Sequence, residues 1–148
     1  MSAPSSYQSL LEQLQQTYQQ LNAQSLSIEL LARVYHPEVE FIDPLHSHHG
    51  LAQVESYFRK LYANVSSIRF EFHQQLLQGD QGCLSWTMHY CHPKLAGGQE
   101  ISVQGISLLE FDSGLIKRHR DYFDAGNMLY EHIPLLGRII RWLKRRLS

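Results

Sequence analysis

The spacing of hydrophobic positions changes twice along the chain, from helical to alternating and back. Apolar residues recur three and four positions apart over residues 6–22 and 51–64, which predicts two amphipathic helices. Between them, residues 25–36 predict a shorter helix that Pro37 stops, because the residue before a proline disfavours the helical conformation. The N-terminal part of the chain should therefore contribute three helices.

Apolar and polar residues alternate in the second half of the chain, as in strands with one buried face. The expected strands are residues 67–78, 83–92, 100–112 and 115–124, with a short one at 39–42 and a loop at 43–50. Helical spacing returns at Ala125 and continues to the end. This order predicts an α+β fold in which three N-terminal helices pack on a curved antiparallel sheet. Such a sheet curls into a half-open cone with a pocket beneath the helices.

Length and composition indicate one globular domain. The chain has 148 residues, of which 43% are hydrophobic. No apolar run approaches the roughly 18 residues of a membrane span, and residues 1–8 lack the pattern of a signal peptide, so we expect a cytoplasmic protein. Cys83 and Cys91 form no CxxC pair, which argues against a disulfide scaffold. No glycine-rich phosphate loop is present, so no cofactor is expected.

Charge is distributed unevenly along the chain. Residues 133–148 carry five basic and no acidic side chains, whereas the other 132 residues carry 8 basic and 14 acidic ones, a balance of −6. Residues 134–148 also have helical spacing, with a tryptophan on the apolar side. This pattern predicts a basic amphipathic helix that contacts an anionic membrane, which would place the protein peripherally on the inner membrane surface. The alternative is a helix that packs its apolar stripe on the body or on a dimer partner.

Three motifs carry a resemblance to a known family. They are YHPEVEFIDP at residues 35–44 followed by Gly50, EFDSGLI at 110–116 and RDYFD at 120–124. Their order and spacing resemble the NTF2-like superfamily, in its SnoaL-like and ketosteroid-isomerase-like branch. The resemblance implies one cone-shaped domain over residues 1–126, with residues 127–148 as an additional helix. It leaves open an isomerase, cyclase, hydrolase or purely binding function, because this fold hosts all of them.

The resemblance also implies candidate catalytic residues. Asp43 matches the position of the ketosteroid isomerase base, while Ser107 stands where that enzyme has a second acidic donor. The alternative for Asp43 is that Asp-Pro only begins a turn. Asp121 resembles the acid/base of SnoaL-type cyclases, and His119 shares its face of the strand. The alternative for this pair is a structural hydrogen bond, or an ionic network on the outer surface.

The remaining expectations concern ligands and partners. The residues expected to contact an apolar ligand are Tyr18, Phe41, Tyr57, Phe58, Trp86, Met88, Tyr90, Ser107 and Phe123. Proton-transfer chemistry would use Asp43 or Asp121. A non-catalytic protein that binds a lipid-like or steroid-like ligand, or an accessory protein at a membrane, is the alternative. The histidines at 46, 48 and 49 have no metal-ligand spacing, so no metal is expected. We also expect a homodimer through the outer sheet face and no nucleic-acid binding.

Overall fold

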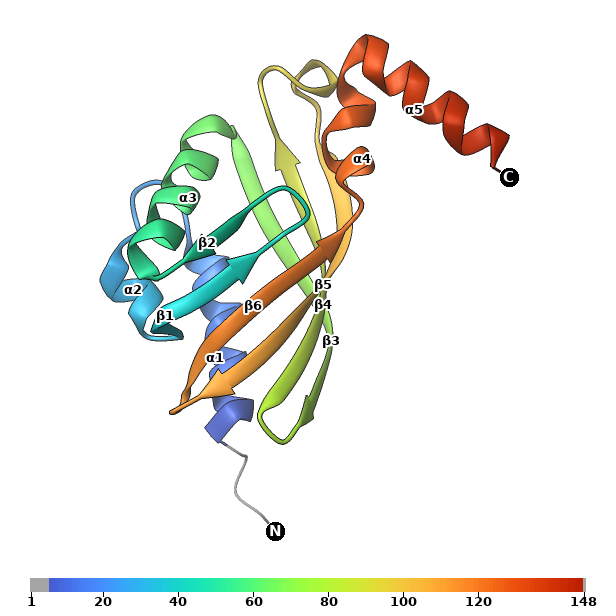
Figure 1. The fold of residues 1–148 in the computed structure, drawn as a ribbon. Helices are drawn as coiled ribbons and strands as arrows, with labels where there is room; N and C mark the ends of the chain where they lie inside the picture. The colour runs from blue at the N-terminus through green and yellow to red at the C-terminus, as the bar shows by residue number, and fades with distance from the viewer. Residues whose placement is uncertain (1–5, 148) are drawn as a thin grey trace.

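The fold is a curved sheet with helices packed on one face (Figure 1). The computed structural model describes residues 6–147. Residues 1–5 of the predicted segment 1–126, and residue 148 of the predicted segment 127–148, lie outside this range. Helices α1 (Ser6–Gln20), α2 (Ile28–Ala32) and α3 (Leu51–Asn64) are the three predicted N-terminal helices. The Ser27 side chain accepts a hydrogen bond from the Leu30 amide and so caps α2.

Six strands form one sheet, in the order β2-β1-β6-β5-β4-β3. Their bounds are β1 Tyr35–Ile42, β2 Ser47–His49, β3 Ser67–Gln78, β4 Gln81–Cys91, β5 Ile101–Asp112 and β6 Leu115–Phe123. Neighbouring strands run antiparallel, except that β1 and β6 are parallel. The sheet is therefore mixed rather than purely antiparallel. The chain between β1 and β6 includes α3 and four strands, so no tight hairpin forces this pair to be antiparallel.

The first two strands also differ from the sequence-based expectation. β1 begins at Tyr35 instead of residue 39, because Tyr35 already pairs with Ile116 of β6. The predicted loop at 43–50 contains β2, whose His48 pairs with Phe41. Both differences arise from pairing with a strand that is distant or very short, which local spacing does not reveal.

The predicted inward faces of the long strands are confirmed. The buried residues on β4 and β5 include Leu84, Trp86, Met88, Tyr90, Val103, Ser107 and Leu109. One apolar cluster joins α1, α2 and α3 to strands β1, β4, β5 and β6, and a second surrounds Trp86. His119 of β6 is only 2% exposed, so the predicted inward phase of this strand is also confirmed.

The end of the chain forms three short segments instead of one continuous helix. They are α4 (Ala125–Met128), a 3₁₀ turn η2 (Tyr130–His132) and α5 (Pro134–Arg146). The helix predicted from residue 134 is thus confirmed, and it extends away from the sheet (Figure 1). Among residues 6–147, no helix is long and apolar enough to cross a membrane. The cytoplasmic location stays a prediction.

The glycine at 105 makes room for Trp86 on the neighbouring strand. A Cβ atom on Gly105 would lie 2.3 Å from the Trp86 indole. We therefore expect Gly105→Ala to lower the free energy of unfolding by about 1–3 kcal/mol, because a well-packed side chain must move. Urea denaturation measures the change. Gln104→Ala, at the exposed neighbouring position, is the matched control, and equal stability of the two variants would contradict this packing role.

The outer face of the sheet exposes apolar side chains that stay candidates for a dimer interface. Ile106 pairs with Tyr122 across β5 and β6, and these residues are 45% and 49% exposed. We expect light scattering to give twice the 17.2 kDa mass of one chain, because such a patch on a long sheet tends to find a partner. Ile106→Glu should shift the mass toward that of one chain. A monomeric mass for the unmodified protein at high micromolar concentration would contradict the prediction.

Candidate functional site

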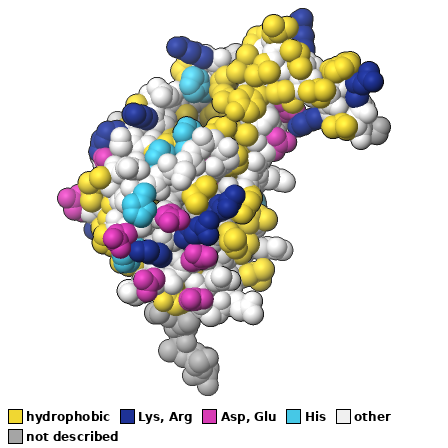
Figure 2. Space-filling model, viewed as in Figure 1, with side chains coloured by type: hydrophobic (Ala, Val, Ile, Leu, Met, Phe, Trp, Pro, Cys, Tyr) yellow, Lys and Arg dark blue, Asp and Glu magenta, His cyan; other side chains and the backbone are white. Residues whose placement is uncertain are grey.

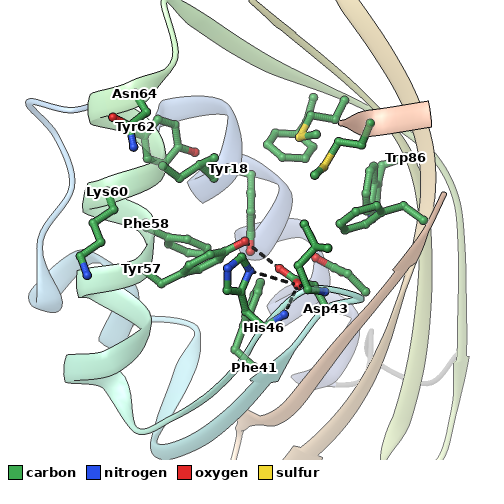
Figure 3. Close-up of a pocket in the computed structure, with 17 residues that line it drawn as sticks. Tyr18, Phe41, Asp43, His46, Tyr57, Phe58, Lys60, Tyr62, Asn64 and Trp86 are labelled. Atoms are coloured by element: carbon green, nitrogen blue, oxygen red, sulfur yellow. Dashed lines mark hydrogen bonds and ion pairs between the residues drawn. The ribbon is translucent and has the colours of Figure 1, made fainter. Parts of the chain in front are cut away.

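A cavity of about 310 Å³ lies between α3, α1 and the sheet (Figure 3). This volume is within the range of small-molecule sites, which is about 300–1,000 Å³. Its lining consists of Tyr18, Phe41, Asp43, Leu45, His46, Tyr57, Phe58, Lys60, Leu61, Tyr62, Asn64, Phe70, Trp86, Met88, Asp121, Phe123 and Met128. Most of these side chains are aromatic or aliphatic. Two carboxylates, Asp43 and Asp121, are the acidic groups in this lining.

Asp43 is held by hydrogen bonds at both carboxylate oxygens. Its Oδ1 accepts from the backbone amides of Leu45 and His46, at 2.8 and 2.7 Å, so the side chain closes the turn after β1. Its Oδ2 accepts from the Tyr57 hydroxyl at 2.6 Å (Figure 3). The Asp43 side chain is only 3% exposed. Each oxygen of the Asp43 carboxylate therefore already accepts a hydrogen bond from the protein.

Asp121 is held at one oxygen only. Its Oδ1 accepts from the Ser107 hydroxyl at 2.5 Å and lies 2.7 Å from His119 Nε2. Trp86 Nε1 donates to the same Ser107 oxygen at 2.9 Å. Among residues 6–147, no hydrogen bond or ion pair reaches Asp121 Oδ2. Since Asp121 also lines the cavity, one oxygen is anchored and the other is available to a ligand.

A buried chain of hydrogen bonds continues behind Asp121. The Tyr35 hydroxyl lies 2.8 Å from His119 Nδ1 and 2.8 Å from the Tyr18 hydroxyl. If Asp121 is ionised and the His119 ring is neutral, His119 Nε2 carries the proton, because a carboxylate only accepts. Nδ1 then accepts from Tyr35, and Tyr35 accepts from Tyr18. The hydrogen bonds from Tyr18 through Tyr35 and His119 then all donate in the direction of the Asp121 carboxylate.

Burial keeps the tyrosines around the cavity protonated. It is the largest cause of the raised pKa of Tyr18, Tyr35, Tyr57 and Tyr62. The hydrogen bond to Asp43 raises the pKa of Tyr57 further, since it favours the neutral phenol. Tyr62 lines the cavity from α3, and its side chain points inward in Figure 3. A neutral phenol at this position can donate a hydrogen bond to a ligand oxygen.

A family model, the SnoaL-like domain, matches residues 14–119. The chain belongs to the SnoaL-like domain family. Its fold is NTF2-like, as the comparison with solved structures also shows. No curated protein matches the sequence. Family membership fixes the fold of this SnoaL-like domain, while the function still depends on the particular side chains in the cavity.

Several solved structures share this fold at low sequence identity. An NTF2-like protein of unknown function from Burkholderia pseudomallei has a TM-score of 0.68 at 14% identity, with 81% of this chain and 94% of that one covered. A hypothetical protein with a ketosteroid isomerase-like fold from Catenulispora acidiphila has a TM-score of 0.70 at 12% identity, with 86% of this chain and 92% of that one covered. An LEH-like epoxide hydrolase from M. tuberculosis has a TM-score of 0.67 at 14% identity, with 93% of this chain and 96% of that one covered.

The cavity of the SnoaL-like domain contains most of the side chains expected from the sequence. Those that line it are Tyr18, Phe41, Tyr57, Phe58, Trp86, Met88, Phe123, Asp43 and Asp121. Three expected residues lie outside the lining. His119 and Ser107 are buried behind Asp121, and the Tyr90 hydroxyl donates instead to the Met128 carbonyl oxygen.

Sequence reasoning missed Tyr35 and Tyr62 as candidate site residues. Tyr35 belongs to the motif at residues 35–44, but its role depends on a contact with His119, 84 positions away. Tyr62 lies four positions after Phe58 on α3. This helical spacing could have placed it on the cavity side, next to Tyr57 and Phe58.

The hydroxyl of Tyr35 should stabilise the fold. Tyr35→Phe removes the partner of both His119 Nδ1 and the Tyr18 hydroxyl in a buried environment. We expect the free energy of unfolding to fall by about 1–3 kcal/mol, as measured by urea denaturation. Tyr122→Phe, at a half-exposed position on the same sheet, is the matched control. An equal loss of stability in both variants would contradict a stabilising role for the buried hydrogen bonds of Tyr35.

Proposed function

We propose that this SnoaL-like domain binds an apolar molecule bearing a carbonyl group and moves a proton on it, with Asp121 as the base. The observation that carries the proposal is the free Oδ2 of Asp121 in an otherwise largely apolar cavity, next to an anchored Oδ1. A positioned carboxylate of this kind can remove a proton from the carbon beside a carbonyl. Asp43, whose two oxygens are both bound, acts as a structural group.

The reaction is a proton shift with no net change in atoms. Asp121 Oδ2 takes the proton as the C–H bond breaks, and the electron pair forms an enolate. The protonated carboxyl then returns the proton to the same carbon or to another carbon of the conjugated ligand. Tyr62 donates a hydrogen bond to the developing enolate oxygen, since its raised pKa keeps the hydroxyl protonated.

His119 and Ser107 position the base in this mechanism. Their bonds to Oδ1 fix the plane of the carboxylate, and the His119 ring is fixed in turn by Tyr35. The aromatic lining selects the ligand, because Phe58, Phe70 and Trp86 offer flat apolar surfaces and few polar partners.

Exchange of carbon-bound hydrogen in D₂O tests the proposal without knowledge of the natural substrate. A panel of apolar bicyclic and polycyclic ketones is incubated with the protein, and deuterium uptake beside the carbonyl is followed by mass spectrometry. We expect Asp121→Asn to slow exchange by about 100-fold or more, while ketone affinity measured by calorimetry changes by less than about tenfold.

Asp43→Asn is the matched control, and it should keep exchange within about tenfold of the unmodified rate. If Asp43→Asn abolishes exchange and Asp121→Asn does not, Asp43 is the base and the assignment is wrong. Ketones that bind tightly without any exchange would favour the alternative, a non-catalytic protein for lipid-like or steroid-like ligands.

A further inference from the structure

Two cations of helix α5, Arg141 and Lys144, contact the body of the protein. Arg141 Nη1 donates to the Glu131 carbonyl oxygen at 2.7 Å. Lys144 Nζ lies 2.8 Å from Glu131 Oε1 and 3.1 Å from Asp124 Oδ2. These contacts hold α5 against α4 and η2 through two of its cations. A surface helix usually does the opposite, since its apolar stripe packs on the core and its charges face water.

Gly137 makes this inverted packing possible. It is the buried residue of α5, and a Cβ atom there would lie 2.3 Å from the Glu131 carbonyl oxygen. The helix backbone therefore rests directly on η2, with no large side chain between them. Consequently, the apolar side of α5 is left pointing away from the body.

This apolar side is exposed along the whole helix. Leu136, Ile139 and Leu143 follow one another at helical spacing and are 38%, 47% and 48% exposed. Leu135, Trp142 and Leu147 widen the stripe and are exposed as well. Hydrophobic side chains gather along α5 in Figure 2, with Lys and Arg side chains at the edges. The stripe needs an apolar partner, which no described part of this chain supplies.

The charge around the stripe restricts what this partner can be. Residues 133–148 carry +5 with no acid, so two copies meeting through α5 would bring like charges together. An anionic lipid surface instead complements both the cations and the apolar stripe. Trp142, with the Arg146 guanidinium 5.0 Å from its ring centre, has the mixed character that suits the boundary between lipid and water. A helix of 13 residues is about 20 Å long, which suits lying in the surface and not crossing it.

We propose that α5 docks this protein on anionic phospholipid membranes, with Leu136, Ile139 and Leu143 inserted between the headgroups. Arg138 and Arg145 then meet lipid phosphates, while Arg141 and Lys144 keep the helix attached to the body. This docking is independent of the acid/base chemistry proposed for Asp121, so either proposal can fail alone.

Flotation with vesicles tests the docking. The full chain should float with vesicles of phosphatidylglycerol and phosphatidylcholine and stay unbound with phosphatidylcholine alone. Raising the salt from about 0.1 M to about 1 M should weaken binding, because the Debye length falls from about 10 Å to about 3 Å. Ile139→Glu and Leu143→Glu should each reduce binding by about tenfold or more, as should the double variant Arg138→Gln/Arg145→Gln.

Matched controls separate docking from general effects of the substitutions. Ile28→Glu changes an isoleucine of similar exposure, 43%, on α2, and Arg33→Gln/Lys94→Gln removes two exposed cations elsewhere. Both should bind as the unmodified protein does. Thermal unfolding verifies that every variant is folded. The proposal is overturned if the unmodified protein ignores anionic vesicles, or if Ile139→Glu binds them equally well. It is also overturned if Ile139→Glu only changes the mass seen by light scattering, since the partner is then a second copy.

Discussion

The parallel pairing of β1 with β6 is the constraint on which the site depends. It places Phe41 beside His119, and so joins the motif at residues 35–44 to the motif at 120–124. Tyr35 can reach His119 only because these strands are neighbours. The end of β1 brings Asp43 to the same cavity that Asp121 enters from β6. Without this one pairing, Asp43 and Tyr35 would lie apart from the His119 and Asp121 pair on β6.

The two carboxylates show how environment assigns different roles to one residue type. Asp43 lies where the chain turns, and backbone amides and Tyr57 use both of its oxygens. Asp121 lies in a strand, where neighbouring backbone groups bond to each other, so only side chains can reach it. Ser107 and His119 approach from the sheet side and take one oxygen. Asp121 also lines the cavity, and this difference is the reason that we propose Asp121 and not Asp43 as the base.

The sequence was most informative where local spacing determines structure. The helical stripe of residues 51–64 and the alternation in β4 predicted α3 and the inward positions of Trp86 and Met88. The resemblance to the SnoaL-like family led to Asp43 and Asp121. It could not rank them, because the difference lies in hydrogen bonds from Tyr57, Ser107 and His119. Tyr35, the parallel pairing and β2 depend on contacts between distant segments, which local patterns do not encode.

The C-terminal helix also shows a limit of pattern analysis. Its amphipathic spacing is compatible with an apolar side that faces either the body or the surroundings, and the sequence left both open. Gly137 and the pairs of Lys144 with Asp124 and Glu131 decide the orientation. The segment that holds α5 begins at α4, where Met128 lines the cavity. Docking of α5 on lipid would therefore bring one wall of the cavity close to the membrane, where apolar ligands of the kind that its aromatic lining favours are concentrated.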